Sequence, residues 1–321
     1  MRRESGFGKT SEKAFRILTL DLMKTSLLKN IDSRRGVRRL RTFGLVLSRR
    51  RALADKAREV SEKLIAAGGG NVLRGFKSAL AGGKASINMS MAKLIRFLDT
   101  GQWFNVYEAV NRETGLKGKA LEREVILRLG EFGPPRVKID RLFHFPRSVH
   151  YASLNLGGPG PWARYDICCV ILDLGHWTPS YTCFSGDTLR AGFDQKGNLA
   201  VARESLLERF AAGEDLGHLA LVQHEAFLGA HPFCIDLGRV RRLLEGEDTM
   251  IELHLFGKVT RDKIREVRLP QAPYERLREL VRQLDRNPGS TARELDSARV
   301  FRALLGRLDR AEIPFVVCGD S

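Results

Sequence analysis

The side chains best suited to chemistry lie between residues 144 and 254. All seven histidines fall in this interval, and random scatter would rarely confine them so closely. Glu252 and His254 alternate with apolar residues over 250–256, which is typical of a strand with one polar face. A carboxylate in a cleft can stabilise the positive charge that develops on a sugar ring when a glycosidic bond breaks. We therefore expect any active site to lie in this interval.

Three segments could together form a cleft for a polar, anionic ligand. The first, 141–147, is predicted as a strand that carries His144 and Arg147. The second begins at Tyr165, continues through an apolar strand over 166–174, and ends in the hydroxyl-rich stretch 181–188. The third is the strand that carries Glu252, followed by a turn and a second strand-like stretch over 259–269.

The second and third segments resemble the core of ADP-ribosyltransferase-like domains of bacterial and phage toxins. In that family a tyrosine–acidic pair leads a strand, a T-x-x-G-D-[ST] turn follows, and a glutamate strand ends in a turn plus I-x-x-[IV]. The corresponding residues here are Tyr165-Asp166, then Thr182 with Gly186-Asp187-Thr188, then Glu252 with Gly257, Ile264 and Val267. The middle turn is one residue longer than the family pattern. The resemblance covers about residues 137–270.

This resemblance implies a split β-sheet that binds NAD as a substrate. We expect no metal, because the histidines have no H-x-x-x-H or H-E-x-x-H spacing. Glu252 would be the catalytic glutamate, hydrogen-bonded to the nicotinamide ribose. His144 or Arg147 would hold the adenosine ribose or a phosphate. The remaining residues that the resemblance assigns to NAD binding are Tyr165, Thr182, Ser185 and His254.

The family often has Glu or Gln two positions before its catalytic glutamate, but position 250 is Met. Gln223-His224-Glu225 has that spacing, so Glu225 is the rival catalytic residue. We prefer Glu252 because the strand and turn around it match the family better.

The elements that must position these residues follow from the spacing of apolar side chains. Residues 1–132 contain helical stripes, such as 53–64 and 87–98, and strand-like patterns begin after Gly133-Pro134-Pro135. Helical patterns over 274–284 and 291–308 precede a final apolar run at 313–317. We predict an α+β protein with three parts: a basic all-helical region (1–132), a mixed or antiparallel sheet domain with flanking helices (133–272), and C-terminal helices with a last strand (273–321).

Most of the positive charge lies in the first third of the chain. Residues 1–100 contain 23 Lys and Arg against 8 Asp and Glu, whereas residues 101–321 contain 31 against 30. A basic helical segment suits a polyanion, so nucleic acid or another polyanion is the expected partner of residues 1–100. An immunity protein or a capsid is a further candidate partner.

Composition indicates a folded protein that acts in the cytoplasm. The chain is 43% hydrophobic and 29% charged, it has no apolar run long enough to span a membrane, and no signal-peptide pattern is evident. Its five cysteines include no C-x-x-C pair, so we expect reduced, buried thiols.

The sequence therefore favours an NAD-dependent ADP-ribosyltransferase-like toxin or effector, with a basic region for docking or delivery. It leaves two alternatives open. One is a nucleic-acid-binding protein or histidine-based nuclease, and the other is a non-enzymatic structural protein of phage or mobile-element origin.

Overall fold

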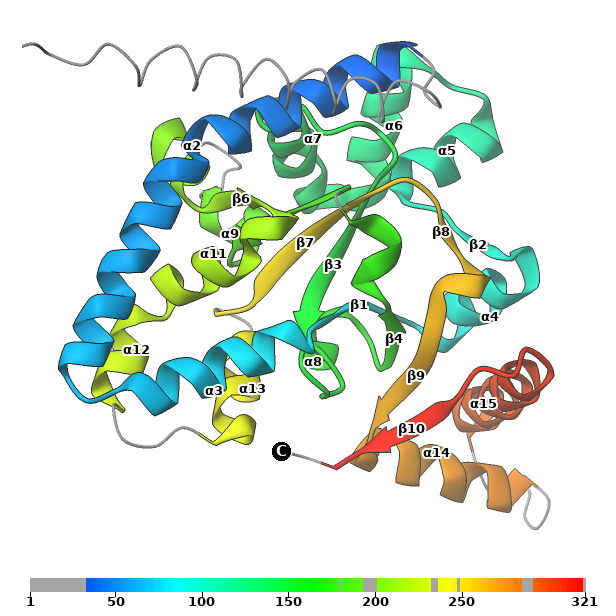
Figure 1. The fold of residues 1–321 in the computed structure, drawn as a ribbon. Coiled ribbons are helices and arrows are strands. Elements are labelled where there is room, and N and C mark those ends of the chain that lie inside the picture. Colours follow the sequence, from blue (N-terminus) through cyan, green and yellow to red (C-terminus); the bar gives the residue numbers. More distant parts are fainter. Residues whose placement is uncertain are drawn as a thin grey trace, which may run out of the picture.

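The computed structural model describes residues 33–178, 180–192, 201–231, 236–246, 249–284 and 291–319. Its centre is an eight-stranded mixed sheet in the order β10-β9-β4-β1-β3-β7-β5-β6 (Figure 1). Strands β9 and β10 pair in parallel, and the other neighbours pair antiparallel. The strands of this sheet are β1 (Lys84–Met89), β3 (Val149–Asn155), β4 (Cys168–Leu172), β5 (Tyr181–Ser185), β6 (Phe210–Ala212), β7 (Ile251–Phe256), β9 (Ile264–Pro270) and β10 (Phe315–Cys318). Strands β2 (Gln102–Trp103) and β8 (Val259–Thr260) form a separate antiparallel pair.

One face of the sheet is apolar and forms the main core. Ile251, Leu253 and Leu255 of β7 point to this face, where helices from both ends of the chain cover the sheet. The helices that contribute fully buried residues to this core are α2 (Ser33–Ala66), α3 (Gly70–Ala81), α4 (Met91–Thr100), α11 (Leu216–Gln223), α12 (Glu225–Ala230), α13 (Leu237–Glu245), α14 (Gln271–Leu284) and α15 (Ala292–Arg310).

The opposite face carries a second, aromatic core near β5, β6 and β7. Phe143 and Phe145 pack there against Phe184, Phe210 and Phe256. Helix α7 (Gly133–Leu142) covers this region, and α5 (Val106–Thr114) and α6 (Gly118–Leu129) pack beside α7 through a smaller apolar cluster. Three short helices complete the described elements: α8 (Trp162–Tyr165), α9 (Thr188–Gly192) and α10 (Arg203–Glu208).

Helix α2 joins the two cores because it runs along the β6 edge of the sheet (Figure 1). Phe43 and Val46 in its first half belong to the aromatic core, whereas Ala57, Val60 and Leu64 in its second half belong to the main core. The helix therefore covers a sheet edge that would otherwise expose unpaired backbone groups.

The face of the sheet that carries the aromatic core becomes polar towards β4. Its side chains there hold the glycine- and proline-rich loop that follows β3. The Asn88 side-chain amide donates to the carbonyls of Pro159 and Asp166. The Asn155 amide donates to Gly158 O, and its oxygen accepts from the backbone N–H of Gly157. These side chains satisfy loop groups that no strand can pair.

Several sequence predictions are confirmed, and two are wrong. The strand expected at 250–256 is β7, and the capping box at Thr291 and Glu294 begins α15. The first 132 residues are not all helical, since β1 lies between β4 and β3 in the middle of the sheet. Residues 137–145 are not a strand: two prolines in the first turn of α7 favour a helix, although the β-branched residues after them have strand propensity.

Four cysteines, Cys168, Cys169, Cys183 and Cys318, are buried free thiols, as expected. Cys234 and residues 1–32 of the basic region lie outside the described residues. Among the described helices, none has the length and apolar character needed to cross a membrane.

Candidate functional site

Glu252 and His254 lie side by side on β7, facing the aromatic core. All six residues of β7 are buried, and Glu252 is 4% and His254 0% exposed. The predicted alternation of β7 is confirmed, but its polar face is covered by protein rather than by solvent. A carboxylate is rarely buried so fully without polar partners.

Hydrogen bonds join Glu252 to Thr188 and His254, and join His254 to Thr182; we call these four residues the glutamate cluster. His254 Nε2 lies 2.8 Å from Glu252 Oε1, and the Thr188 hydroxyl donates to the same oxygen at 2.6 Å. Thr182 Oγ1 lies 3.1 Å from His254 Nδ1. Both bonds to the carboxylate end on Oε1, and within the described residues no hydrogen bond reaches Oε2.

His254 is neutral in this arrangement. Burial lowers the pKa of His254, and its hydrogen bond to Glu252 only partly offsets that effect. With Nε2–H donating to Glu252, Nδ1 accepts a hydrogen bond from the Thr182 hydroxyl. Because a carboxylate only accepts, Glu252 selects the tautomer in which His254 Nε2 carries the proton, and the Thr182 hydroxyl serves as the matching donor to Nδ1.

A second buried polar group lies next to the cluster. The Asp140 carboxylate accepts hydrogen bonds from the hydroxyls of Tyr107, at 2.7 Å, and Tyr151. The Arg136 guanidinium lies 3.8 Å from Asp140 and 3.5 Å from the centre of the Tyr151 ring. Tyr151 also packs edge-on against His254, with ring centres 5.3 Å apart. Burial raises the pKa of Asp140, and the charge of Arg136 opposes that effect.

A tight turn after β5 places Thr188 over the carboxylate. Gly186 has a φ of +99°, which glycine adopts readily, and its N–H donates to Met250 O. Asp187 caps α9 by accepting from the N–H of Leu189, and it also accepts from the Tyr165 hydroxyl at 2.7 Å. The G-D-T stretch is therefore a turn whose last residue reaches Glu252.

Arg209 supplies a positive charge next to the turn at Gly186 that leads to Thr188. Its guanidinium lies 5.0 Å from the ring centre of Phe184, which pairs in register with Glu252. Burial lowers the pKa of Arg209, and no carboxylate pairs with it among the described residues. Such a group suits an anionic ligand.

The structure brings together only part of the predicted site. Glu252, His254 and Thr182 are in contact, and Tyr165 is connected to them through Asp187 and the turn. Ser185 pairs in register with Ile251 and therefore faces the main core, opposite Glu252.

For His144 the predicted strand is wrong, and Arg147 and Glu225 are bound to other parts of the protein. His144 and Arg147 follow α7 in a turn instead of sharing a strand, and the Arg147 guanidinium donates to Gly118 O and Glu122 of α6. Glu225 begins α12 and forms a surface ion pair with Lys63 of α2 at 3.0 Å. Its side chain is 39% exposed, so its environment differs from that of Glu252.

Sequence reasoning missed the positioning roles of Thr188, Arg136 and Asp140. Thr188 was visible as the last residue of the G-D-T motif. Arg136 and Asp140 have the i, i+4 spacing of a helical ion pair, but that spacing is informative only if 133–142 is known to be a helix.

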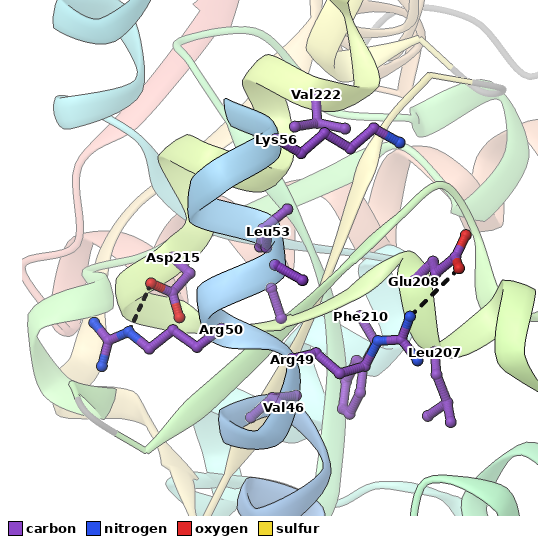
Figure 2. A pocket seen from close by; sticks show the side chains of 12 residues that line it. Val46, Arg49, Arg50, Leu53, Lys56, Leu207, Glu208, Phe210, Asp215 and Val222 are labelled. Atoms are coloured by element: carbon purple, nitrogen blue, oxygen red, sulfur yellow. Dashed lines mark hydrogen bonds and ion pairs between the residues drawn. The ribbon is translucent and has the colours of Figure 1, made fainter. Parts of the chain in front are cut away.

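The described cavities lie beside α2, away from the glutamate cluster. Figure 2 shows one of about 200 Å³, where Val46 and Leu53 of α2 face Leu207 and Phe210. Another, of about 630 Å³, lies between α2, α3 and α11. Within the described part of the chain, no cluster of three or more His, Cys, Asp or Glu side chains could hold a metal ion.

Comparison of this chain with protein-family models, curated proteins and solved structures finds no match.

Proposed function

We propose that the protein is an NAD-dependent ADP-ribosyltransferase-like enzyme in which Glu252 is the catalytic carboxylate. The observation that carries the proposal is the state of this carboxylate: Oε1 is held by Thr188 and His254, whereas Oε2 has no hydrogen bond among the described residues. A fixed carboxylate with one free oxygen can accept a ribose hydroxyl and stabilise an oxocarbenium-like transition state.

The neighbouring charges agree with a dinucleotide substrate. Arg209 lies next to the turn at Gly186 without a carboxylate partner in the described residues, so it is available to the diphosphate of NAD. The neutral His254 keeps the carboxylate in place without cancelling its negative charge. That charge is what would stabilise the positively charged transition state. Glu252 is therefore preferred to Glu225, which is already paired with Lys63 at the surface.

Substrate can reach Glu252 only if the cover of the cluster moves. Thr188 is the first residue of α9, a helix of five residues that is tied to α8 by the bond between Tyr165 and Asp187. A short element with few buried apolar side chains can open locally at low cost. Displacement of α9 would open the cluster so that a hydroxyl of the substrate ribose can reach Oε2 of Glu252.

The proposal extends to the sheet, the biological role and the partners of the protein. The large sheet together with the β2–β8 pair would correspond to the split sheet of the family. The protein would act inside a cell as a toxin or effector, on an acceptor macromolecule of undefined class, with an immunity protein or a capsid as a further partner.

The test is nicotinamide release from labelled NAD by the full chain, with cell lysate supplying acceptors. Glu252→Gln keeps the shape of the side chain and removes its charge, and we expect it to lower turnover by at least 100-fold. Glu225→Gln is the matched control and should retain wild-type turnover. Thermal unfolding of both variants checks that they fold.

Wild-type turnover in Glu252→Gln would overturn the assignment of the catalytic residue. A loss in Glu225→Gln alone would transfer the role to that residue. If the wild-type protein releases no nicotinamide with any acceptor, the enzyme proposal fails and the non-enzymatic alternatives become the better explanation.

A further inference from the structure

The first half of α2 has the most uneven charge of the described elements. Residues 33–51, which we call the arginine segment, contain eight arginines and no acidic residue. These are Arg34, Arg35, Arg38, Arg39, Arg41, Arg49, Arg50 and Arg51. The second half of the helix is nearly balanced, since Asp55, Glu59 and Glu62 accompany its basic residues.

The arginine segment is attached to the body of the protein through residues 42–46. The buried Thr42 hydroxyl donates to the carbonyls of Phe143, at 2.9 Å, and His144, at 3.0 Å. Phe43 packs edge-on against Phe256, and Val46 is 2% exposed. Residues 42–46 therefore hold the helix against the body of the protein, and the helical backbone of the segment spans about 28 Å.

Two arginines of the segment pair with carboxylates of neighbouring elements. Arg49 pairs with Glu208, and Arg50 pairs with Asp215 and Glu214; Figure 2 shows the bonds to Glu208 and Asp215. Arg41 is exposed and has no carboxylate partner among the described residues. The segment remains strongly positive even when these three carboxylates are counted.

The environment of the helix selects the kind of polyanion. A helix that binds a membrane surface inserts its apolar face among the lipids, but five apolar residues of α2 are already buried in the two cores: Phe43, Val46, Ala57, Val60 and Leu64. The exposed Ile65 lies at the other end of the helix, away from the arginine segment. Single-stranded nucleic acid is bound by exposed aromatic rings, and the only aromatic residue of α2, Phe43, is 8% exposed. What the segment offers is a helical backbone with eight arginines and no acidic residue, and guanidinium groups suit the phosphates of a duplex.

We propose that residues 33–51 of α2 form a docking surface for the phosphate backbone of double-stranded nucleic acid. The length of the segment corresponds to about eight base pairs at 3.4 Å each. Phosphate contacts carry no sequence information, so binding is sequence-tolerant and depends steeply on salt. With about five contacts, affinity falls about 500-fold between about 50 and about 200 mM salt.

The test measures binding of the full chain to two 20-base-pair DNA duplexes of unrelated sequence over this range of salt. Arg38→Gln, Arg39→Gln and Arg41→Gln are combined, because glutamine favours a helix and removes only charge. The control combines Arg276→Gln, Arg278→Gln and Arg282→Gln in α14, which removes three exposed arginines from another helix. Circular dichroism checks that both variants fold.

We expect the wild-type protein to bind both duplexes with similar affinity. The α2 variant should lose about three units of the slope of log affinity against log salt, so that the same change in salt weakens it only about 10-fold. The α14 variant should behave as the wild type. Equal effects of the two variants, or no duplex binding by the wild type, would overturn the proposal. Binding to vesicles of anionic lipid without binding to DNA would show that the segment serves a membrane instead.

Discussion

Replacing His224 with leucine should make the protein more resistant to acid. His224 lies between α11 and α12, is 4% exposed, and packs edge-on against Phe76. Within the described residues its Nε2 has no hydrogen-bond partner. Burial lowers the pKa of His224 from 6.5 to about 4, because the charged imidazolium would lose its hydration.

The sign and size of the effect follow from the two pKa values. As pH falls below 6.5 the unfolded chain binds a proton at His224, whereas the folded protein binds it only near pH 4. Protonation therefore favours unfolding, and the folded state loses about 2 kcal/mol between about pH 7 and about pH 5 through this residue. Burial also lowers the pKa of His150 to about 4. The wild-type protein therefore loses more free energy of unfolding over this pH range than His224 alone accounts for.

The assay is urea denaturation at pH 7 and pH 5, which measures the free energy of unfolding of each variant. The wild type should lose about 2 kcal/mol more than His224→Leu between the two pH values. Phe76→Leu is the control, because it loosens the same packing without removing a titrating group. It should be less stable at both pH values and keep the acid sensitivity of the wild type. If His224→Leu loses as much stability as the wild type, the burial argument is wrong.

Two further predictions concern buried groups elsewhere. Asp140→Ala should lower the free energy of unfolding by about 3–5 kcal/mol, because it leaves the Arg136 guanidinium buried without its carboxylate. Urea denaturation measures this loss. A loss below about 1 kcal/mol would show that the ion pair contributes little to stability. Gly213→Ala should lower the melting temperature, because a β-carbon at Gly213 would overlap the Tyr181 ring. A thermal scan checks this, with Gly217→Ala as a control that has open space around it, and equal melting temperatures would contradict the prediction.

Much of the local structure could be read from the sequence because the signals are local. The alternation over 250–256 requires a strand with two different faces, and Thr291 with Glu294 marks a helix start in any context. Prediction from neighbouring residues fails where strand-favouring and helix-favouring residues lie in the same segment. The β-branched residues over 137–145 favour a strand, but the prolines before them and the packing of α7 on the aromatic core decide for a helix. Likewise, nothing local distinguishes β1 from the helical stripes around it.

The candidate site was predictable only as a set of residue types. Glu252, His254 and Thr182 were found because strand alternation and short motifs mark them. His144, Arg147, Ser185 and Glu225 have equally suitable side chains, and only the pairing of strands and the packing of helices place them away from the cluster. Thr188 joins the site because the turn at Gly186 returns the chain over β7, and a turn's direction is a tertiary property.

The sequence by itself determined the division of charge along the chain, the alternation of β7 and the start of α15, because each depends on neighbours within a few residues. Only the tertiary structure decided that the polar face of β7 is buried, that Glu252 is held by residues 64 and 2 positions away, and that α2 spans both cores. The physical reason is that burial and hydrogen bonding between distant segments arise from the packing of the whole chain, which no local pattern encodes.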